Sequence, residues 1–287
     1  MEEPTKTVML TNNPKPLIDS HVHIFPEKMM KAIFTFFHAQ YQWDPPFSTN
    51  PEVILRDLEN QGVNKSFCLA YAHKPGISRK LNSWLAGFSN SNPSIIPFGA
   101  VHPLDQDMRS IVLECLDQFR FPGMKLHCQV QQCSPDDERL NPLYESIIER
   151  SGGMIIHASS FPQPHKKYLG IDHISRLLKR FPDLNLIIPH LGLYELPGYR
   201  KLLEKYPGLY LDTAFVFQNG GYIPPVDQIV EMLLAFPDRI IYGSDYPFIL
   251  EAPQNGINRI LELGLPPESY RALFYDNAMN FLARITL

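Results

Sequence analysis

The sequence predicts an α/β protein folded as a single (β/α)8 barrel, the TIM-barrel fold. Eight short β-rich runs alternate with longer amphipathic stretches over 287 residues, and 287/8 gives about 36 residues for each βα unit, which is normal for that unit. Several β-rich runs are continuously apolar, as expected for strands buried on both faces of a parallel sheet. The length also suits one α/β barrel domain.

The eight predicted strands include two clear continuous apolar runs, at residues 154–156 and 186–188. In chain order the strands are expected at residues 17–21, 66–71, 95–101, 123–128, 154–157, 185–190, 209–213 and 240–245. A doubly wound open sheet is the alternative, because the number of strands alone does not show that a sheet closes. No Gly-rich phosphate loop follows any of these strands, which weakens a nucleotide-binding open sheet.

Amphipathic stretches predict the helices between the strands, with Asn50 as the cap before Pro51 and Gly62 as a stop signal. They are expected at residues 51–61, 79–88, 108–119, 142–150, 171–181, 199–206 and 226–236, with closing helices around 257–263 and 277–285. Residues 41–50, which include Trp43, read as a long loop after the first strand, where barrels place segments that face substrate.

The domain organisation is simple, with a polar N-terminal arm at residues 1–16 and one barrel domain at residues 17–287. The arm has no apolar region typical of a signal peptide. No window offers about 18 uninterrupted apolar residues, so no membrane span is expected. The prolines gather at element boundaries, and neither a linker nor an internal repeat is visible.

Composition and charge exclude some classes of function. The net charge is −4 and there is no basic block, so a nucleic-acid partner is not expected. No cysteine pair has C-x-x-C spacing, which favours reduced, mostly buried thiols in a cytoplasmic protein; the four are Cys68, Cys115, Cys128 and Cys133. The expected partner is a small-molecule substrate, and a homo-oligomer stays open because no sequence feature marks such a surface.

Five predicted strand ends carry residues that bind metals or move protons. These are Asp19, His21 and His23 at the end of the first strand, Lys125 and His127 at the end of the fourth, His157 at the end of the fifth, His190 at the end of the sixth and Asp245 at the end of the eighth. Because the carboxyl ends of parallel barrel strands open at one mouth, we expect these side chains to meet there. Clustered imidazoles and carboxylates with an open position predict a catalytic metal site.

The first strand supplies the strongest motif of this set. His21 and His23 lie two residues apart, so both side chains point to the same face and can share one cation. Asp19 has the same parity and is expected one step deeper, where it could orient a histidine or accept a hydrogen bond.

Other polar and aromatic residues receive no firm role, since a single histidine or exposed lysine usually has none. Five histidines fall in this class, although two of them, His102 and His165, follow strands and could touch substrate; the others are His38, His73 and His173. Candidates for substrate recognition after the strands are Lys74, Arg79, Lys166, Lys167, Tyr194, Phe215 and Tyr246.

At these residues the sequence resembles the amidohydrolase superfamily, specifically the amidohydrolase-2 or aminocarboxymuconate-semialdehyde-decarboxylase-like family. The matching segments are LIDSHVHIFP, PGMKLHCQVQ, MIIHASS, LIIPHLG, LYLDTAF, YGSDYPF and DNAMNFL. The resemblance implies that the metal ligands are His21, His23, His157 and Asp245. It also implies that His190 acts beside a metal-bound water and that Asp245 accepts a proton. The expected cofactor is one divalent ion, by default zinc, with manganese, cobalt or iron as alternatives.

The fourth strand departs from one pattern of the resembling superfamily. Some amidohydrolases bridge two metals with a carboxylated lysine on this strand, but the G-x-K-x-H form here does not match that pattern, so we expect one ion. Lys125 and His127 share a face and are predicted to contact the substrate or a metal ligand, with ligation of a second ion by His127 as the alternative.

Three functions remain in competition. A metal-activated water favours a hydrolase that acts on an amide, lactone or ester. The resemblance also implies a non-oxidative decarboxylase of an unsaturated or aromatic acid, although such enzymes are generally longer than this chain, which favours hydrolysis. A barrel that has lost catalysis and only binds a partner is the third hypothesis, and the intact set of histidines and Asp245 speaks against it.

Overall fold

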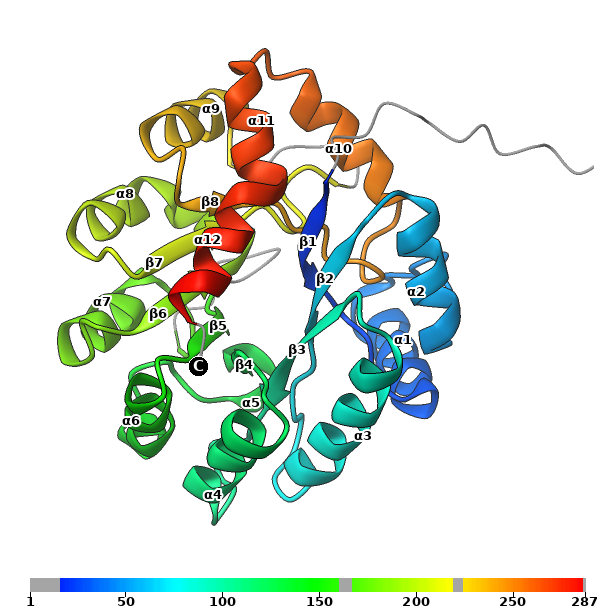
Figure 1. Ribbon diagram of the computed structural model, residues 1–287, viewed down its shortest axis with the longest axis vertical. Coiled ribbons are helices and arrows are strands. Elements are labelled where there is room, and N and C mark those ends of the chain that lie inside the picture. The colour runs from blue at the N-terminus through cyan, green and yellow to red at the C-terminus, as the bar shows by residue number, and fades with distance from the viewer. Residues whose placement is uncertain (1–15, 160–166, 219–223, 286–287) are drawn as a thin grey trace, which may run out of the picture.

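The computed structural model describes residues 16–159, 167–218 and 224–285, and within them eight parallel strands form one sheet in chain order (Figure 1). The strands are β1 (Ile18–Val22), β2 (Lys65–Leu69), β3 (Ile95–Ala100), β4 (Gly123–His127), β5 (Gly153–His157), β6 (Asn185–Ile188), β7 (Leu209–Asp212) and β8 (Ile240–Ile241). Each pairs with its neighbour in parallel, and helices surround the ring. The predicted (β/α)8 fold is confirmed.

Backbone hydrogen bonds between the segment after β8 and β1 close the barrel. The Ser20 N–H donates to the Tyr242 carbonyl at 2.9 Å, and the His23 N–H donates to the Tyr246 carbonyl at 2.8 Å. The strand itself ends at Ile241, earlier than the predicted residue 245, because the chain turns before Asp245, which has a left-handed φ of 73°. This closure rules out the doubly wound alternative.

The helices cover the outside of the barrel in the order that the sequence predicts. They are α1 (Glu27–Tyr41), α2 (Pro51–Asn60), α3 (Ser78–Ser91), α4 (Met108–Leu113), α5 (Cys128–Gln131), α6 (Asn141–Glu149), α7 (Ile171–Arg180), α8 (Leu196–Lys205), α9 (Val226–Ala235), α10 (Pro253–Leu261), α11 (Pro267–Arg271) and α12 (Asn277–Arg284). The side chain of Asn50 accepts from the backbone N–H groups of Glu52 and Val53, as its predicted capping role requires.

Three helices were not expected from the sequence: α1, the short α5 and α11. Helix α1 begins after Pro26 without a side-chain cap, and only its Met30 is fully buried. It lies between the first strand and the predicted loop at residues 41–50, so the connection from β1 to α2 contains a helix that was not predicted.

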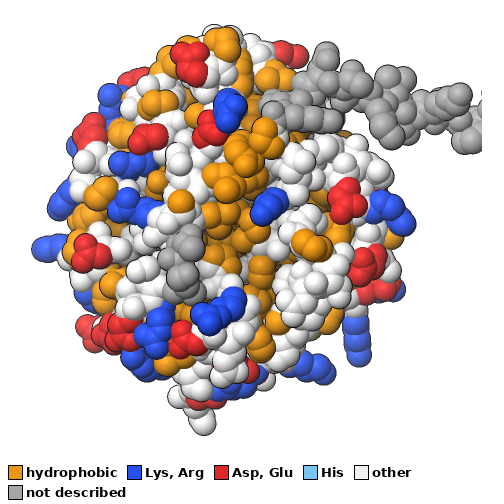
Figure 2. All heavy atoms as spheres, viewed as in Figure 1, with side chains coloured by type: hydrophobic (Ala, Val, Ile, Leu, Met, Phe, Trp, Pro, Cys, Tyr) orange, Lys and Arg blue, Asp and Glu red, His pale blue; other side chains and the backbone are white. Residues whose placement is uncertain are grey.

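The interior of the barrel is apolar at the amino ends of the strands. Phe67, Phe98, Ile155 and Ile187 pack there with Phe281 of α12. Figure 2 shows the face on which α12 lies, with apolar side chains gathered in the middle and charged ones around the edge. Because α12 closes this end, polar chemistry is left to the opposite end, at the carboxyl ends of the strands.

Several smaller predictions have a structural counterpart. All four cysteines are buried and none forms a disulfide, as expected from their spacing. Among the described helices, none combines the length and the apolar character that a bilayer crossing requires. Residues 1–15 of the predicted arm, together with His165 and Lys166, lie outside the described residues.

Candidate metal centre

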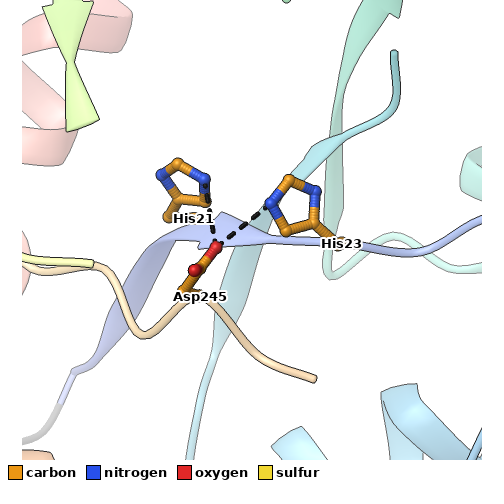
Figure 3. Close-up of side chains that lie close together, drawn as sticks. All are labelled: His21, His23 and Asp245. Carbon is orange, nitrogen blue, oxygen red and sulfur yellow. Dashed lines mark ion pairs between the residues drawn. The ribbon is translucent and has the colours of Figure 1, made fainter. Parts of the chain in front are cut away.

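Three predicted ligands meet at the carboxyl end of the barrel. His21 and His23 come from the end of β1, and Asp245 comes from the turn after β8 (Figure 3). The Oδ1 atom of Asp245 lies 3.4 Å from Nε2 of His21 and 3.1 Å from Nε2 of His23. One candidate ligand atom from each residue lies within 4.8 Å of the other two.

Hydrogen bonds to the far nitrogen of each ring fix how these histidines face the site. Nδ1 of His23 lies 2.9 Å from the carbonyl oxygen of Leu69, which can only accept, so Nδ1 carries the proton and Nε2 keeps the lone pair. Nδ1 of His21 lies 2.8 Å from Oδ2 of Asp212. Both Nε2 atoms therefore face Asp245 as electron-pair donors.

The donor set fits a divalent cation. His21 is fully buried, and its Nε2 has no hydrogen-bond partner in the described part of the chain. A buried ring nitrogen without a partner is costly unless it binds something else. Two imidazole nitrogens and one carboxylate oxygen are typical ligands of zinc and other divalent transition metals.

The carboxylate of Asp19 accepts hydrogen bonds from the backbone rather than from a histidine ring. Its Oδ1 accepts from the backbone N–H of His21 at 3.1 Å and from that of Ser244 at 3.0 Å. These bonds tie β1 to the turn that carries Asp245. Burial raises the pKa of Asp19 to about 7, an effect that both backbone bonds oppose.

His157 and His190 form a second pair beside this cluster. Nε2 of His190 lies 3.0 Å from Nδ1 of His157, and Nδ1 of His190 lies 2.8 Å from the carbonyl oxygen of Ala214. The ring of His190 is 5.3 Å from that of His21, centroid to centroid. His157 is thus brought to the site next to His190, outside the compact group of His21, His23 and Asp245.

The segment that carries His190 has an unusual backbone. Strand β6 ends at Ile188, and the next residues form η3 (Pro189–Glu195) with left-handed φ values of 63° at His190 and 51° at Leu191. Left-handed φ values are rare for residues other than glycine and concentrate at functional sites. The backbone N–H of His190 donates to Oδ1 of Asp212 at 3.0 Å, which holds this turn in place.

Asp212, at the end of β7, is the site residue that the sequence analysis missed. One carboxylate joins the ring of His21, the backbone of His190 and the backbone N–H of Ala214 at 2.9 Å. Burial raises its pKa to about 7, while the bonds from His190 and Ala214 and the charge of Lys125 oppose the rise. Its position at a strand end within LYLDTAF, like Asp245 after the next strand, was the available signal.

Strand β4 brings Lys125 and His127 to the same region. Lys125 is fully buried, and burial lowers its pKa to about 8 against the opposing charges of Asp212 and Asp245. The ring of His127 stacks on that of His157 at 4.0 Å, and its backbone N–H donates to Oε1 of Gln131 at 2.9 Å.

Aromatic side chains form one wall of the site. The ring of Phe248 stacks on that of His23 at 4.4 Å, and Tyr71 lies edge-on to His23 at 5.8 Å. Phe37 of α1 packs against Phe248 at 5.0 Å, while Trp43 donates from Nε1 to the Phe248 carbonyl at 2.8 Å. The unexpected helix α1 and the predicted loop therefore support the wall beside His23.

The other substrate-recognition candidates lie in mixed positions. Phe215 is close to the site, with its ring 6.4 Å from that of His190. Arg79 instead pairs with Asp107 and Glu114 on the surface. The hydroxyl of Tyr246 donates to Asp57, and the Nδ1 atom of His102 accepts from the backbone of Leu104; Lys74, Lys167 and Tyr194 are exposed.

Comparison with known proteins supports the fold. No curated protein matches the sequence. Solved structures match the fold, among them an uncharacterised TIM-barrel protein from Bordetella bronchiseptica with 20% identity, a TM-score of 0.74 and coverage of 94% of this chain and 99% of that chain.

Two further solved structures have names that state an activity. A 5-carboxyvanillate decarboxylase from Novosphingobium aromaticivorans, complexed with manganese and a nitrobenzoic acid, is 15% identical with a TM-score of 0.71, over 93% of this chain and 96% of that chain. A 4-oxalomesaconate hydratase from Rhodopseudomonas palustris is 15% identical with a TM-score of 0.62, over 94% and 96%. At these identities the likeness shows the fold.

The family is decided by the sequence itself. A family model described as amidohydrolase matches residues 18–284, which include β1 with its two histidines, the turn with Asp245 and all strands between them. This chain belongs to the amidohydrolase family.

Proposed function

We propose that this protein is a metal-dependent hydrolase that acts on an amide, lactone or ester bond of a small molecule. His21, His23 and Asp245 hold one divalent ion, with His157 as the fourth protein ligand and zinc as the default metal. The convergence of two oriented imidazoles and one carboxylate oxygen supports this ligand set. A divalent ion at such a site lowers the pKa of a bound water to about 7 and polarises a carbonyl group.

The orientation of the His190 ring is the single observation that most supports hydrolysis. Because the carbonyl of Ala214 accepts from Nδ1 of His190, the neutral ring keeps its lone pair on Nε2, which lies 3.0 Å from Nδ1 of His157, the proposed fourth ligand. Hydrolysis needs a base at that place to take a proton from the attacking water, and Asp245 offers a second acceptor. Once protonated, His190 can give the proton to the leaving group.

A non-oxidative decarboxylase is the second candidate, and the aromatic wall favours it. Phe248 and Tyr71 flank His23, and such apolar rings suit a planar unsaturated acid and remove water from its carboxylate. The names of two structural neighbours describe decarboxylases of aromatic acids, 5-carboxyvanillate and 2,6-dihydroxybenzoate. This reaction requires a proton donor to carbon, whereas His190 is oriented as an acceptor.

One assay separates the two candidates. Metal-loaded protein is incubated with a panel of lactones, amides, esters and unsaturated or aromatic carboxylic acids, while carbon dioxide release and acid production are recorded together. Acid production without carbon dioxide supports the hydrolase. Carbon dioxide release from a free acid would overturn hydrolysis in favour of decarboxylation.

A further inference from the structure

Two side-chain nitrogen atoms from β4 lie near the site and form no hydrogen bond with the described residues. Nζ of Lys125 and Nδ1 of His127 are both buried and have no hydrogen-bond partner among the described residues. The two residues lie two positions apart on one strand, so their side chains share the inner face of the barrel. The ring of His127 stacks on that of His157, which places its Nδ1 beside this proposed metal ligand.

The surroundings of Lys125 do not account for its charge. In the register of the sheet it pairs with Ile155 of β5 and Ala100 of β3, both buried and apolar. No described carboxylate oxygen lies within 4.0 Å of its Nζ, so Lys125 forms no ion pair with the described residues. An ammonium group in such a place costs several kcal/mol, on the order of the desolvation of a buried ion, unless something binds it.

The two nearest sources of negative charge already have other partners. Asp212 accepts from His21, His190 and Ala214, and Asp245 faces the Nε2 atoms of His21 and His23. Both carboxylates influence Lys125 through their charge, yet neither accepts a hydrogen bond from it. The three N–H bonds of the ammonium are therefore left for a group that comes from outside the chain.

We propose that Lys125 and His127 form an anion subsite that binds a carboxylate, or a similar oxyanionic group, of the substrate. This inference rests on the proposed function, because it assigns the substrate class of the same site: a small molecule that carries an anionic group next to the bond that reacts. The ammonium of Lys125 and the Nδ1–H tautomer of His127 each donate to one oxygen of the anion.

A second feature suits a carboxylate with an unsaturated or aromatic body. Tyr71 lies edge-on to His127 at 4.8 Å and edge-on to His23 at 5.8 Å, so one aromatic ring borders both the anion subsite and the metal ligands. An anionic head on β4 would therefore leave the rest of the ligand against this ring. Aromatic faces and edges favour planar partners.

The test uses the full chain loaded with metal and two simple probes, acetate and benzoate. Their binding is measured by calorimetry for the parent and for K125M, K125R and H127N, and the metal content of each sample is determined. K65M is the matched control, because Lys65 is a strand lysine at the opposite, exposed end of β2 and its loss changes the net charge equally.

We expect K125M to weaken benzoate binding roughly 10- to 100-fold, the loss that follows removal of a hydrogen bond to a charged group. K125R should retain part of the affinity, H127N should lose less than K125M, and K65M should match the parent. Metal content should stay unchanged in all four. K125M should also be at least as heat-stable as the parent, since methionine removes a buried unpaired charge.

Benzoate binding by K125M equal to that of the parent would overturn the anion subsite, and so would a parent that binds neither probe. Loss of metal from K125M would also overturn it, because Lys125 would then support the metal ligands. A parent that binds benzoate through Lys125 but holds no metal would retain the subsite while contradicting the proposed hydrolase. The two failures are therefore distinguishable.

Discussion

Oδ2 of Asp212 lies 2.8 Å from Nδ1 of His21, and Oδ1 of the same carboxylate accepts the backbone N–H of His190. One side chain on β7 thus sets the orientation of a proposed metal ligand on β1 and of the proposed base after β6. Carboxylates in this position fix the tautomer of a ligating imidazole and increase its basicity. The proposed metal ligands and the proposed base therefore depend on each other through Asp212.

The first prediction concerns D212N. The amide oxygen can still accept from the backbone of His190, but an amide nitrogen turned toward Nδ1 of His21 would donate rather than accept. We expect metal affinity to fall roughly 10- to 100-fold while the fold is kept. Competition with a chelator measures the affinity, and circular dichroism checks the fold. Unchanged affinity would show that Asp212 does not set the tautomer.

The second prediction separates metal binding from proton transfer. H190A removes the proposed base but none of the three residues of the compact cluster. We expect the metal content to remain that of the parent and turnover of a hydrolysable substrate to fall about 10²- to 10⁴-fold, the usual contribution of general acid–base catalysis. Turnover within a few-fold of the parent would assign the base to another group, Asp245 first.

The third prediction concerns the position of β4, which carries Lys125 and His127. A Cβ atom added to Gly123 would lie 2.1 Å from the backbone oxygen of Gly153, so β4 and β5 would have to separate. We expect G123A to lower the free energy of unfolding by more than about 3 kcal/mol. Urea unfolding measures the loss.

The control for this change is G87A on α3. Nothing lies within 4 Å of a Cβ atom at Gly87, which is a helix residue. The change should stabilise the protein by roughly 0.5–1 kcal/mol, the difference in helix propensity between glycine and alanine. Equal effects of the two substitutions would contradict the close packing of β4 against β5.

The fourth prediction concerns pH and is made for metal-free protein. Burial lowers the pKa of Lys125 from 10.5 to about 8, so between these values the unfolded chain binds more protons than the folded one. The contribution of Lys125 to the unfolding free energy is therefore least favourable below pH 8 and improves as pH rises. The change is at most about 3.5 kcal/mol, since the pKa differs by about 2.5 units and one unit corresponds to about 1.4 kcal/mol.

The comparison with K125M isolates this contribution. Below pH 8 we expect the variant to be more stable than the parent, and the difference should shrink as the pH rises toward 10.5. Urea unfolding at several pH values measures it. A difference that stays constant over this range would mean that Lys125 keeps its usual pKa in the folded protein.

The sequence predicted the barrel because the hydrophobic periodicity of each element and the alternating order of strands and helices can be seen without knowing any long-range contact. Strands β6 and β8 end earlier than predicted, at Ile188 and Ile241. The residues that follow take left-handed backbone angles, in η3 and at Asp245, and their residue types give no signal of this conformation. Helix α1 was missed although Met30, Ile33 and Phe37 recur at helical spacing, because apolar residues such as Phe36 and Tyr41 also lie on its exposed side.

The residues of the candidate site were easier to predict than the hydrogen bonds between them. His21, His23 and Asp245 could be placed at one mouth from topology alone. Asp19 accepts hydrogen bonds, one of its two predicted roles, but its partners could not be predicted, because they are the backbone of His21 and Ser244 while Asp212 contacts the ring. These hydrogen-bond partners depend on the three-dimensional positions of residues that are far apart in the sequence. His21 and Asp212, for example, are 191 positions apart.

The central claim is that His21, His23 and Asp245 bind one divalent ion that the activity needs. Elemental analysis of purified protein, before and after dialysis against a chelator and reloading, measures this most directly, with H21A and D245A in parallel. We predict one ion per parent chain, loss of metal and activity together in both variants, and recovery of the parent on reloading. Activity that persists in fully metal-free parent protein, or a metal content equal in parent and variants, would contradict the account.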